Sequence, residues 1–297
     1  MQTKIKSSES SVESESGLVV ERRFTSAGQD PFESFEWIEM DVQIRNPDGS
    51  MADSLEGVKL PSGFSGVPGT VCAQKYLRKA GVPKYLRTVP EDDVPIWLQR
   101  SEPDHERLQT VDAAERMGGE IDGRQLFRRL AGTWTYWGWK YGYFASEADA
   151  RAYFDEMCYL IASQRSAPNS PQWFNTGLHW AYGIEGPAQG HSYVDPDTGE
   201  LGKSTNAYEH PQPHACFIQS VSDSLVGGTD SIMGLWNREA LLFKYGSGTG
   251  SNFSNIRGKG EPLSGGGTSS GLLSFLKIGD RAAGAIKSGG TTRRAAK

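Results

Sequence analysis

The chain has 297 residues, of which 37% are hydrophobic and 10% aromatic, and it carries a formal net charge of −5. This length suffices for one large domain or two ordinary ones, and no apolar run approaches the ~18 residues that a membrane span needs. The three cysteines, Cys72, Cys158 and Cys216, are widely spaced and lie outside any CxxC pair, which argues against a disulfide scaffold or a zinc site and favours the reducing cytoplasm.

The N-terminal segment changes composition twice. Residues 1–17 are rich in serine and glutamate and hold no apolar stretch, so they predict a disordered tail and not a secretory signal. The alternating apolar residues of EWIEMDVQI (36–44) predict a strand. Residues 46–66, with their glycines, prolines and serines, predict a loop.

Helical patterns follow as far as residue 166. We expect helices over 71–81 and 122–142, the second of which runs into an aromatic loop. The clearest pattern is that of 147–165, where apolar residues recur three and four positions apart. The sequence therefore predicts a mainly helical domain over 18–166.

The pattern of residue types changes after residue 166. Residues 183–213 form a loop with Gly, Pro and His that is longer than a compact domain usually carries without a use for it. HACFIQSV (214–221) predicts a short buried strand. A helix is expected next, over 229–246, with Asp230 or Ser231 as its N-cap.

Glycine-rich stretches then alternate with a second helix. KYGSGTGSNFSNIRGKGEPLSGGG (244–267) is typical of a loop. A helix follows from Ser269 or Ser270 and is expected to stop at Gly289-Gly290. The order strand, helix, loop, helix, loop predicts an α/β domain over 167–297 whose loops gather at one end of a sheet.

Positive charge coincides with these glycines. Residues 253–297 hold eight Lys or Arg against two acidic residues, a local charge of +6, so the other 252 residues carry −11. The stretch is no Walker A loop, and it lacks the dinucleotide fingerprint because GSGTG follows a predicted helix. Glycine-rich backbone beside arginines favours an anion site, and a mobile surface loop is the alternative.

Several single residues have two readings. Cys216 lies within a predicted strand, where a free cysteine is usually a small buried hydrophobic residue. We expect the same structural role for Cys72 and Cys158. The carboxylate of Asp223 could accept a hydrogen bond from a sugar hydroxyl, and it could equally well be an N-cap or stabilise a turn. The five histidines have no metal-ligand spacing, so no metal site is expected. The aromatic cluster TWTYWGWKYGY (133–143) is typical of core packing or a partner surface, with stacking on bases as the alternative.

Three stretches taken together are more specific. NSPQWFNTG, ACFIQSVSDSL and LWNREALLFKYGSGTGSNFSNIRGKGEPLSGGGTSSGLLSFLKIGDRAAGAIKSGGTTRRAAK resemble ribonucleotide reductase, most closely the class II, adenosylcobalamin-dependent large chain. The likeness extends over about 18–297 and is weak across 183–213. It implies an α/β fold, with a mainly helical region followed by the first part of a ten-stranded α/β barrel.

The resemblance also implies roles for individual residues. Cys216 matches one of two thiols that reduce the substrate and become a disulfide. The positions that match the substrate site are Ser170, Ala215, Cys216 and Gly248. Those that match the site of the allosteric effector, or the two specificity loops GEPLSGGGTSSG and KSGGTTRR, are Asp223, Arg257, Ser264, Gly265, Lys287 and Arg293.

As partners, the resemblance implies a ribonucleotide substrate, deoxynucleoside triphosphate effectors, a thioredoxin-like reductant and a second copy of the chain, with neither nucleic acid nor membrane. Its cofactor would be adenosylcobalamin, most of whose contacts we expect beyond residue 297. The radical-bearing cysteine and the second reducing cysteine are also expected there. We therefore expect this chain to be the front part of a cytoplasmic enzyme and to be inactive alone.

Two other functions fit the same residues. A non-catalytic nucleotide-binding module, or the product of a pseudogene fragment, would keep the glycine loops without the catalytic half. A partner-binding scaffold would use the aromatic cluster at 133–143 and would have no affinity for nucleotides.

Overall fold

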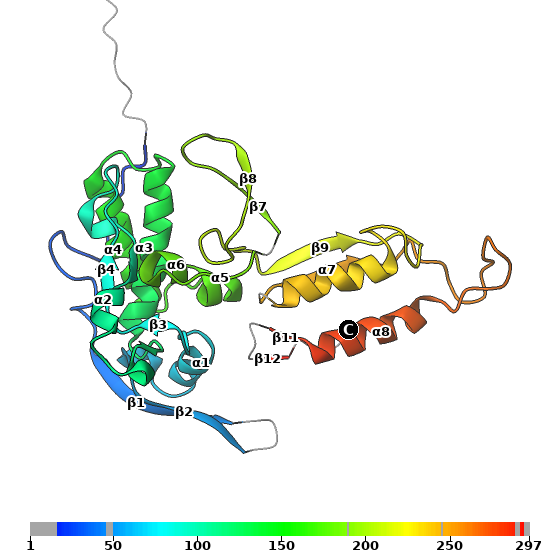
Figure 1. The fold of residues 1–297 in the computed structure, drawn as a ribbon, viewed down its shortest axis with the longest axis horizontal. Coiled ribbons are helices and arrows are strands. Elements are labelled where there is room, and N and C mark those ends of the chain that lie inside the picture. Colours follow the sequence, from blue (N-terminus) through cyan, green and yellow to red (C-terminus); the bar gives the residue numbers. More distant parts are fainter. Residues whose placement is uncertain (1–16, 46–49, 189, 245, 289–291, 294–297) are drawn as a thin grey trace, which may run out of the picture.

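The structure is a computed structural model that describes residues 17–45, 50–188, 190–244, 246–288 and 292–293. A helical N-terminal body is followed by a smaller strand-and-helix unit that projects from it (Figure 1). Within these residues the strands pair in six two-stranded sheets, and no closed barrel forms. Most of the predicted disordered tail, residues 1–16, lies outside the described residues.

A long antiparallel hairpin begins the body. It pairs β1 (Trp37–Arg45) with β2 (Met51–Pro61), so the predicted strand is confirmed and the loop predicted over 46–66 is wrong for most of its length. Val58 and Leu60 are fully buried on one face of β2 while Lys59 points away from it. The alternation that makes this a strand is therefore real, but Gly57 and Pro61 obscured it in the sequence.

Short elements follow the hairpin. In chain order they are the 3-10 helix η1 (Ser62–Phe64), α1 (Val67–Lys75), β3 (Val82–Pro83), β4 (Leu86–Thr88), η2 (Ile96–Leu98), β5 (Ser101–Pro103), α2 (His105–Leu108), η3 (Ala113–Glu115) and β6 (Met117–Gly118). The helix predicted over 71–81 is thus present as α1 but begins and ends earlier, since Pro68 occupies its first turn.

Two long helices, α3 (Gly123–Lys140) and α4 (Glu147–Ala162), form the centre of the body and confirm the predictions for 122–142 and 147–165. Asp122 caps α3 in a capping box with Gln125, and Ser146 caps α4. Their apolar faces pack with the hairpin into one core, whose largest members include Leu60, Phe127 and Ile161.

A buried ion pair crosses this core. The Arg129 guanidinium on α3 lies 2.7 Å from Glu120, and both side chains are about 1% exposed. Arg129 also donates to the carbonyls of Trp173 and Thr176, while Glu120 accepts from the Tyr182 hydroxyl at 2.8 Å. The pair therefore connects α3 to both short helices that follow α4.

Those helices are α5 (Ser170–Asn175) and α6 (Leu178–Tyr182). Gly177 between them has φ +85°, and a Cβ there would lie 2.3 Å from the Arg129 carbonyl oxygen. Only glycine fits at this contact, so the turn packs directly against the α3 backbone.

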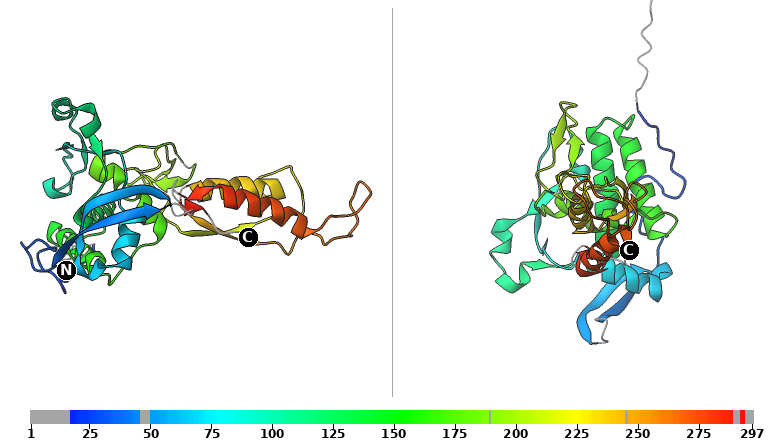
Figure 2. Two further views of the ribbon diagram at one scale, coloured as in Figure 1. Left: turned by 90° about the horizontal axis from the view of Figure 1, so that it is seen from below. Right: turned by 90° about the vertical axis from the view of Figure 1, so that its right-hand side faces the viewer.

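The loop predicted over 183–213 contains a small hairpin of β7 (Ser192–Val194) and β8 (Leu201–Lys203). Beyond it, the projecting unit consists of β9 (Cys216–Ser220), α7 (Ile232–Lys244), β10 (Gly248–Asn252), α8 (Leu272–Ala285), β11 (Lys287–Ser288) and β12 (Thr292–Arg293). Helices α7 and α8 lie side by side in it (Figures 1 and 2), joined by Trp236, Leu272 and Leu276.

The two predicted helices of this unit are confirmed, with Ser231 accepting from Gly234 N at the start of α7. The expected helix end at Gly289-Gly290 lies outside the described residues, and α8 stops at Ala285. The glycine stretch, however, is not all loop: GTGSN forms β10, which pairs in parallel with β9. The unit is a β-α-β crossover, which only the pairing of strands distant in sequence could show.

A strand was predicted over 214–221, and the prediction that this strand is buried is wrong. Strand β9 is present, but Cys216 is exposed and Ile218 is 88% exposed. Each of β9 and β10 has a single strand neighbour among the described residues, which leaves the outer edge of each strand unpaired. No helix in the described part of the chain is both long and apolar enough to span a bilayer.

The buried ion pair gives the first prediction. Arg129→Met leaves the Glu120 carboxylate buried without its cation, so we expect the free energy of unfolding to fall by ~3–5 kcal/mol. Urea denaturation monitored by tryptophan fluorescence measures it. The matched control is Arg87→Met, which breaks the exposed Arg87–Glu102 pair and should cost no more than ~1 kcal/mol. Equal losses in the two variants would contradict the assignment.

Candidate functional site

Three predicted substrate residues meet where β9 begins. Cys216 is the register partner of Gly248 in the parallel pair, and Gly248 N donates to the Ala215 carbonyl. A Cβ at Gly248 would lie 3.2 Å from Cys216 Sγ. The missing side chain of Gly248 therefore leaves the space beside this thiol open.

The three cysteines differ in access. Cys216 is exposed, whereas Cys72 and Cys158 are buried in the body. Burial raises the pKa of Cys72 to about 12 and raises that of Cys158 well above its usual value. The prediction that Cys72 and Cys158 are buried structural residues is confirmed. The corresponding interpretation of Cys216 as a buried hydrophobic residue is wrong.

The opposite end of the strand pair joins Asp223 to Arg257. Because β9 and β10 are parallel, the residues that follow them emerge at the same edge, as the sequence predicted for the loops. Arg257 Nε lies 2.5 Å from Asp223 Oδ2, and Arg257 N also donates to this carboxylate. The hydrogen bond from the guanidinium lowers the pKa of Asp223.

Arg257 also holds the loop that follows. It donates to the Pro262 carbonyl at 2.8 Å, and Pro262 pairs with Thr268 across the loop. Ser264 and Gly265 lie in the exposed turn between them. The Arg257 guanidinium thus joins Asp223 to the start of the loop that carries Ser264 and Gly265.

The remaining predicted residues lie on other elements. Lys287 and Arg293 are register partners in the β11–β12 pair, but their side chains are outside the described residues, as is Arg294. Ser170 is exposed at the first residue of α5, in the body. Among the described residues no hydrogen bond or ion pair joins it to Cys216, so its place in a substrate site stays a prediction.

Sequence reasoning missed the side chains that fix α7 to the strands. Arg238 donates to Gln219 Oε1 at 2.7 Å and to the Ser220 carbonyl, and Thr249 donates to the buried carboxylate of Glu239 at 2.9 Å. The signal in the sequence was a charged pair, Arg238-Glu239, inside a largely apolar helix.

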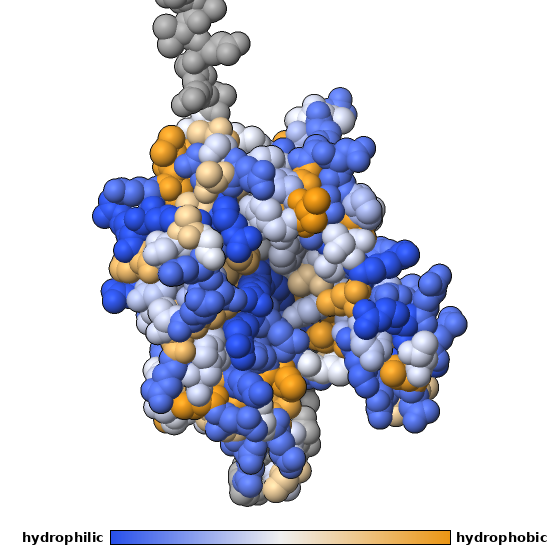
Figure 3. Space-filling model, turned by 90° about the vertical axis from the view of Figure 1, so that its left-hand side faces the viewer, coloured by the Kyte–Doolittle hydropathy of each residue, from blue (hydrophilic) through white to orange (hydrophobic). Residues whose placement is uncertain are grey.

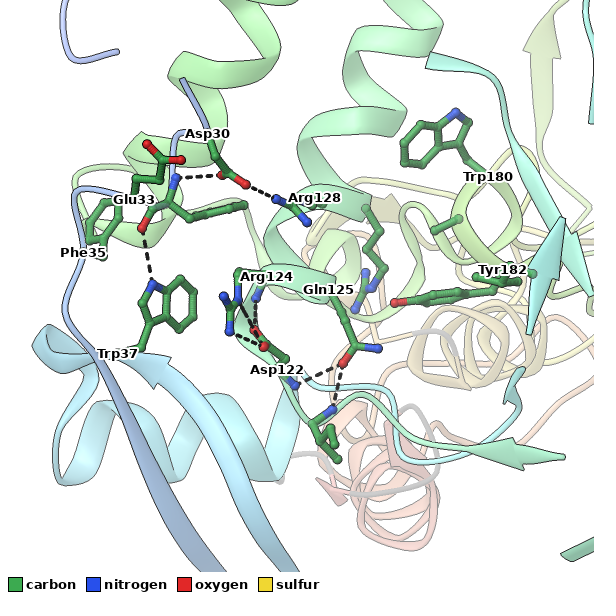
Figure 4. A pocket seen from close by; sticks show the side chains of 15 residues that line it. Asp30, Glu33, Phe35, Trp37, Asp122, Arg124, Gln125, Arg128, Trp180 and Tyr182 are labelled. Atoms are coloured by element: carbon green, nitrogen blue, oxygen red, sulfur yellow. Dashed lines mark hydrogen bonds and ion pairs between the residues drawn. The ribbon is translucent and has the colours of Figure 1, made fainter. Parts of the chain in front are cut away.

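The body has a hollowed, largely hydrophilic face (Figure 3). A cavity of about 860 Å³ lies between Trp37, Trp180 and α3 (Figure 4). Its arginines are already paired, Arg124 with Asp122 at 2.7 Å and Arg128 with Asp30 at 2.5 Å. Arg129, the third arginine of the lining, is paired with Glu120, so the described residues offer this cavity no free cation for a phosphate.

Two family models match the chain. One, described as class II vitamin B12-dependent ribonucleotide reductase, matches residues 39–164, and the other, the barrel domain of ribonucleotide reductase, matches residues 214–297. The described part of this barrel region shows the β9–β10 pair and its helices but no closed barrel.

Curated relatives agree with these models. Proteins named vitamin B12-dependent ribonucleotide reductase from Agrobacterium fabrum and Bradyrhizobium diazoefficiens are 65% and 63% identical over 278 residues, which is 94% of this chain and 22% of each relative. One from Rhodopirellula baltica is 36% identical over 282 residues, 95% of this chain and 24% of that protein. The chain therefore spans less than a quarter of the length of these relatives.

The different access of the cysteines gives the second prediction. Iodoacetamide added to the folded chain should label Cys216 first, because Cys72 and Cys158 are buried and their raised pKa values disfavour the reactive thiolate. Mass spectrometry of the digested protein measures the order of labelling. Cys216→Ser should remove the fast phase, and unfolding in guanidinium should make the other two thiols reactive. Labelling of Cys72 as fast as Cys216 in the folded chain would contradict this prediction.

Proposed function

The chain belongs to the class II vitamin B12-dependent ribonucleotide reductase family, and from this premise we propose that it forms the front part of an enzyme that reduces ribonucleotides to 2′-deoxyribonucleotides. The observation that supports the proposal most strongly is the exposed Cys216 thiol on β9, opposite a glycine that leaves the space beside it open. We also propose that this enzyme is located in the cytoplasm.

The proposed role of Cys216 follows from the electron balance. Replacing a ribose 2′-hydroxyl by hydrogen, with loss of water, takes two electrons, and two thiols supply them by forming a disulfide. Cys216 would be one of the two. Cys72 and Cys158 are buried in the body, so the second thiol and the radical-bearing cysteine are proposed to come from polypeptide outside this chain. A thioredoxin-like reductant would restore both thiols.

Substrate and effector would occupy opposite ends of the β9–β10 pair. We propose Ala215, Cys216 and Gly248, with Ser170, for the substrate site. Asp223, Arg257, Ser264, Gly265, Lys287 and Arg293 would form the effector site. Asp223 would accept a hydrogen bond from the sugar of a deoxynucleoside triphosphate, and Arg257 would place its positive charge near the phosphates.

The domain division is also a proposal: a tail over 1–17, a helical region over 18–166 and the start of a ten-stranded barrel over 167–297. The parallel β9–β10 pair with its crossover helix α7 supports such a beginning, since α/β barrels are built from these units. We propose a second copy of the chain as a partner, and this proposal is supported only by the resemblance to the family.

Adenosylcobalamin is the proposed cofactor of the whole protein, where it would supply the radical that starts the reaction. A corrin needs an enclosing surface, whereas the end of β9 that carries Cys216 is exposed. The described residues around Cys216 therefore do not enclose a corrin by themselves. We propose that most of the cofactor's contacts lie outside this chain.

The effector site gives the third prediction. Equilibrium binding of dATP or dTTP to the chain should weaken by about tenfold or more in Asp223→Ala and in Arg257→Ala, because each removes a charged hydrogen-bonding partner. Arg281→Ala, which removes an exposed arginine from α8, is the matched control and should leave affinity nearly unchanged. Absence of nucleotide binding by the unaltered chain would favour the scaffold alternative.

The reducing thiol gives the fourth. In the complete product of the gene that encodes this chain, Cys216→Ser should abolish formation of deoxynucleotide while retaining nucleotide binding, since a hydroxyl cannot form the disulfide. The assay needs a thioredoxin-like reductant and should succeed only with adenosylcobalamin added. A requirement for iron and a second subunit instead would refute the class, and the 297-residue chain alone should show no turnover.

A further inference from the structure

A cleft of about 1030 Å³ brings together two parts of the chain that the proposed function leaves unused. One wall is the aromatic cluster of residues 133–143, and the other is the loop over 183–213 with its β7–β8 hairpin. The hairpin is held over the cluster by the Tyr141 hydroxyl, which donates to the Val194 carbonyl, and by Lys140, 3.7 Å from Asp197. The long loop therefore serves to close one side of a cavity.

Flat apolar surface lines this cleft. The aromatic rings come from α3, α4, β7 and the turn between the two long helices, and include Trp134, Trp137, Tyr141, Phe144, Tyr153 and Tyr193. Such rings offer their negative faces to a positive charge and their area to a flat ligand.

The charges of the cleft are predominantly negative. Both of its cations are already paired, Lys140 with Asp93 at 2.8 Å and Arg100 with Glu91 at 3.7 Å. The carboxylates of Glu185 and Glu209 are exposed at the rim. Burial lowers the pKa values of His179 and His210, which also line the cleft, so neither ring adds positive charge at neutral pH. A phosphate or carboxylate ligand would find no free cation among these described residues.

Two polar atoms in the cleft wall lack a hydrogen-bond partner. One is Oγ1 of Thr133, a residue only 3% exposed, and the other is Nδ1 of His191. His191 Nε2 contacts the His210 carbonyl, which can only accept, so Nε2 carries a proton, and in the tautomer that is protonated there alone Nδ1 is an acceptor. A buried polar atom left unpaired costs free energy, and a ligand that donates hydrogen bonds would satisfy both.

We propose that this cleft binds a small organic cation that has N–H donors and a flat apolar portion, as in an amidinium, a guanidinium or an aryl-substituted ammonium. The aromatic rings would hold the flat part, the unpaired oxygen of Thr133 and nitrogen of His191 would accept its N–H groups, and the rim carboxylates would balance its charge.

The test uses benzamidinium and its neutral analogue benzamide, which have nearly the same shape. Isothermal titration calorimetry with the complete gene product should show benzamidinium binding roughly tenfold more tightly than benzamide. Replacing both rim carboxylates, Glu185→Gln with Glu209→Gln, should reduce this preference severalfold. Glu106→Gln, an exposed glutamate on α2, is the matched control and should change nothing. Equal affinity for the two probes, or no binding of either, would overturn the proposal.

A second pair of variants separates binding from folding. Thr133→Val removes the unpaired hydroxyl at constant shape, and should weaken benzamidinium roughly tenfold without lowering thermal stability. Thr135→Val is its matched control, because the Thr135 hydroxyl already donates to the Ala131 carbonyl at 2.7 Å and is not in the cleft wall. It should lower stability and leave affinity unchanged. Unaltered affinity in Thr133→Val would overturn the assignment of Thr133 as a ligand contact.

Discussion

The buried contact between Arg129 and Glu120 is the constraint on which the N-terminal body depends. The guanidinium reaches the carbonyls of Trp173 and Thr176 and so fixes α5 to α3, while Glu120 accepts from Tyr182 and so fixes α6. Burying both charges is affordable only because their hydrogen bonds are made by the protein. Gly177 completes this arrangement by letting the turn between α5 and α6 touch the α3 backbone.

A second constraint, the parallel pairing of β9 and β10, organises the projecting unit. It places Cys216 beside Gly248 at one end and brings Asp223 to Arg257, 34 residues away in sequence, at the other. The length of one pair of strands therefore separates an exposed thiol from the loop that holds the Asp223–Arg257 ion pair. In the enzyme proposed above, the substrate site and the effector site would then lie on the same two strands.

Sequence alone predicted the long helices α3, α4, α7 and α8 well because their signals are local. The capping residues Asp122 and Ser146 and the apolar periodicity of α4 are visible within one stretch. Strand β10 was missed because Gly248 and Gly250 have low strand propensity and its partner is 32 residues away. Resemblance named Asp223 and Arg257 for the site, but their direct pairing required coordinates. The burial of Arg129 was unpredictable, since an arginine on a helix ordinarily faces water.

The unpaired outer edges of β9 and β10 have a consequence for anyone who handles this chain in isolation. Each strand has one neighbour within the described residues, and Ile218 projects into solvent. An open ladder of backbone amides and carbonyls invites another strand to add to it, whether from a chaperone or from an identical molecule. Recombinant preparations should therefore be sensitive to concentration and gain solubility from any polypeptide that completes the sheet.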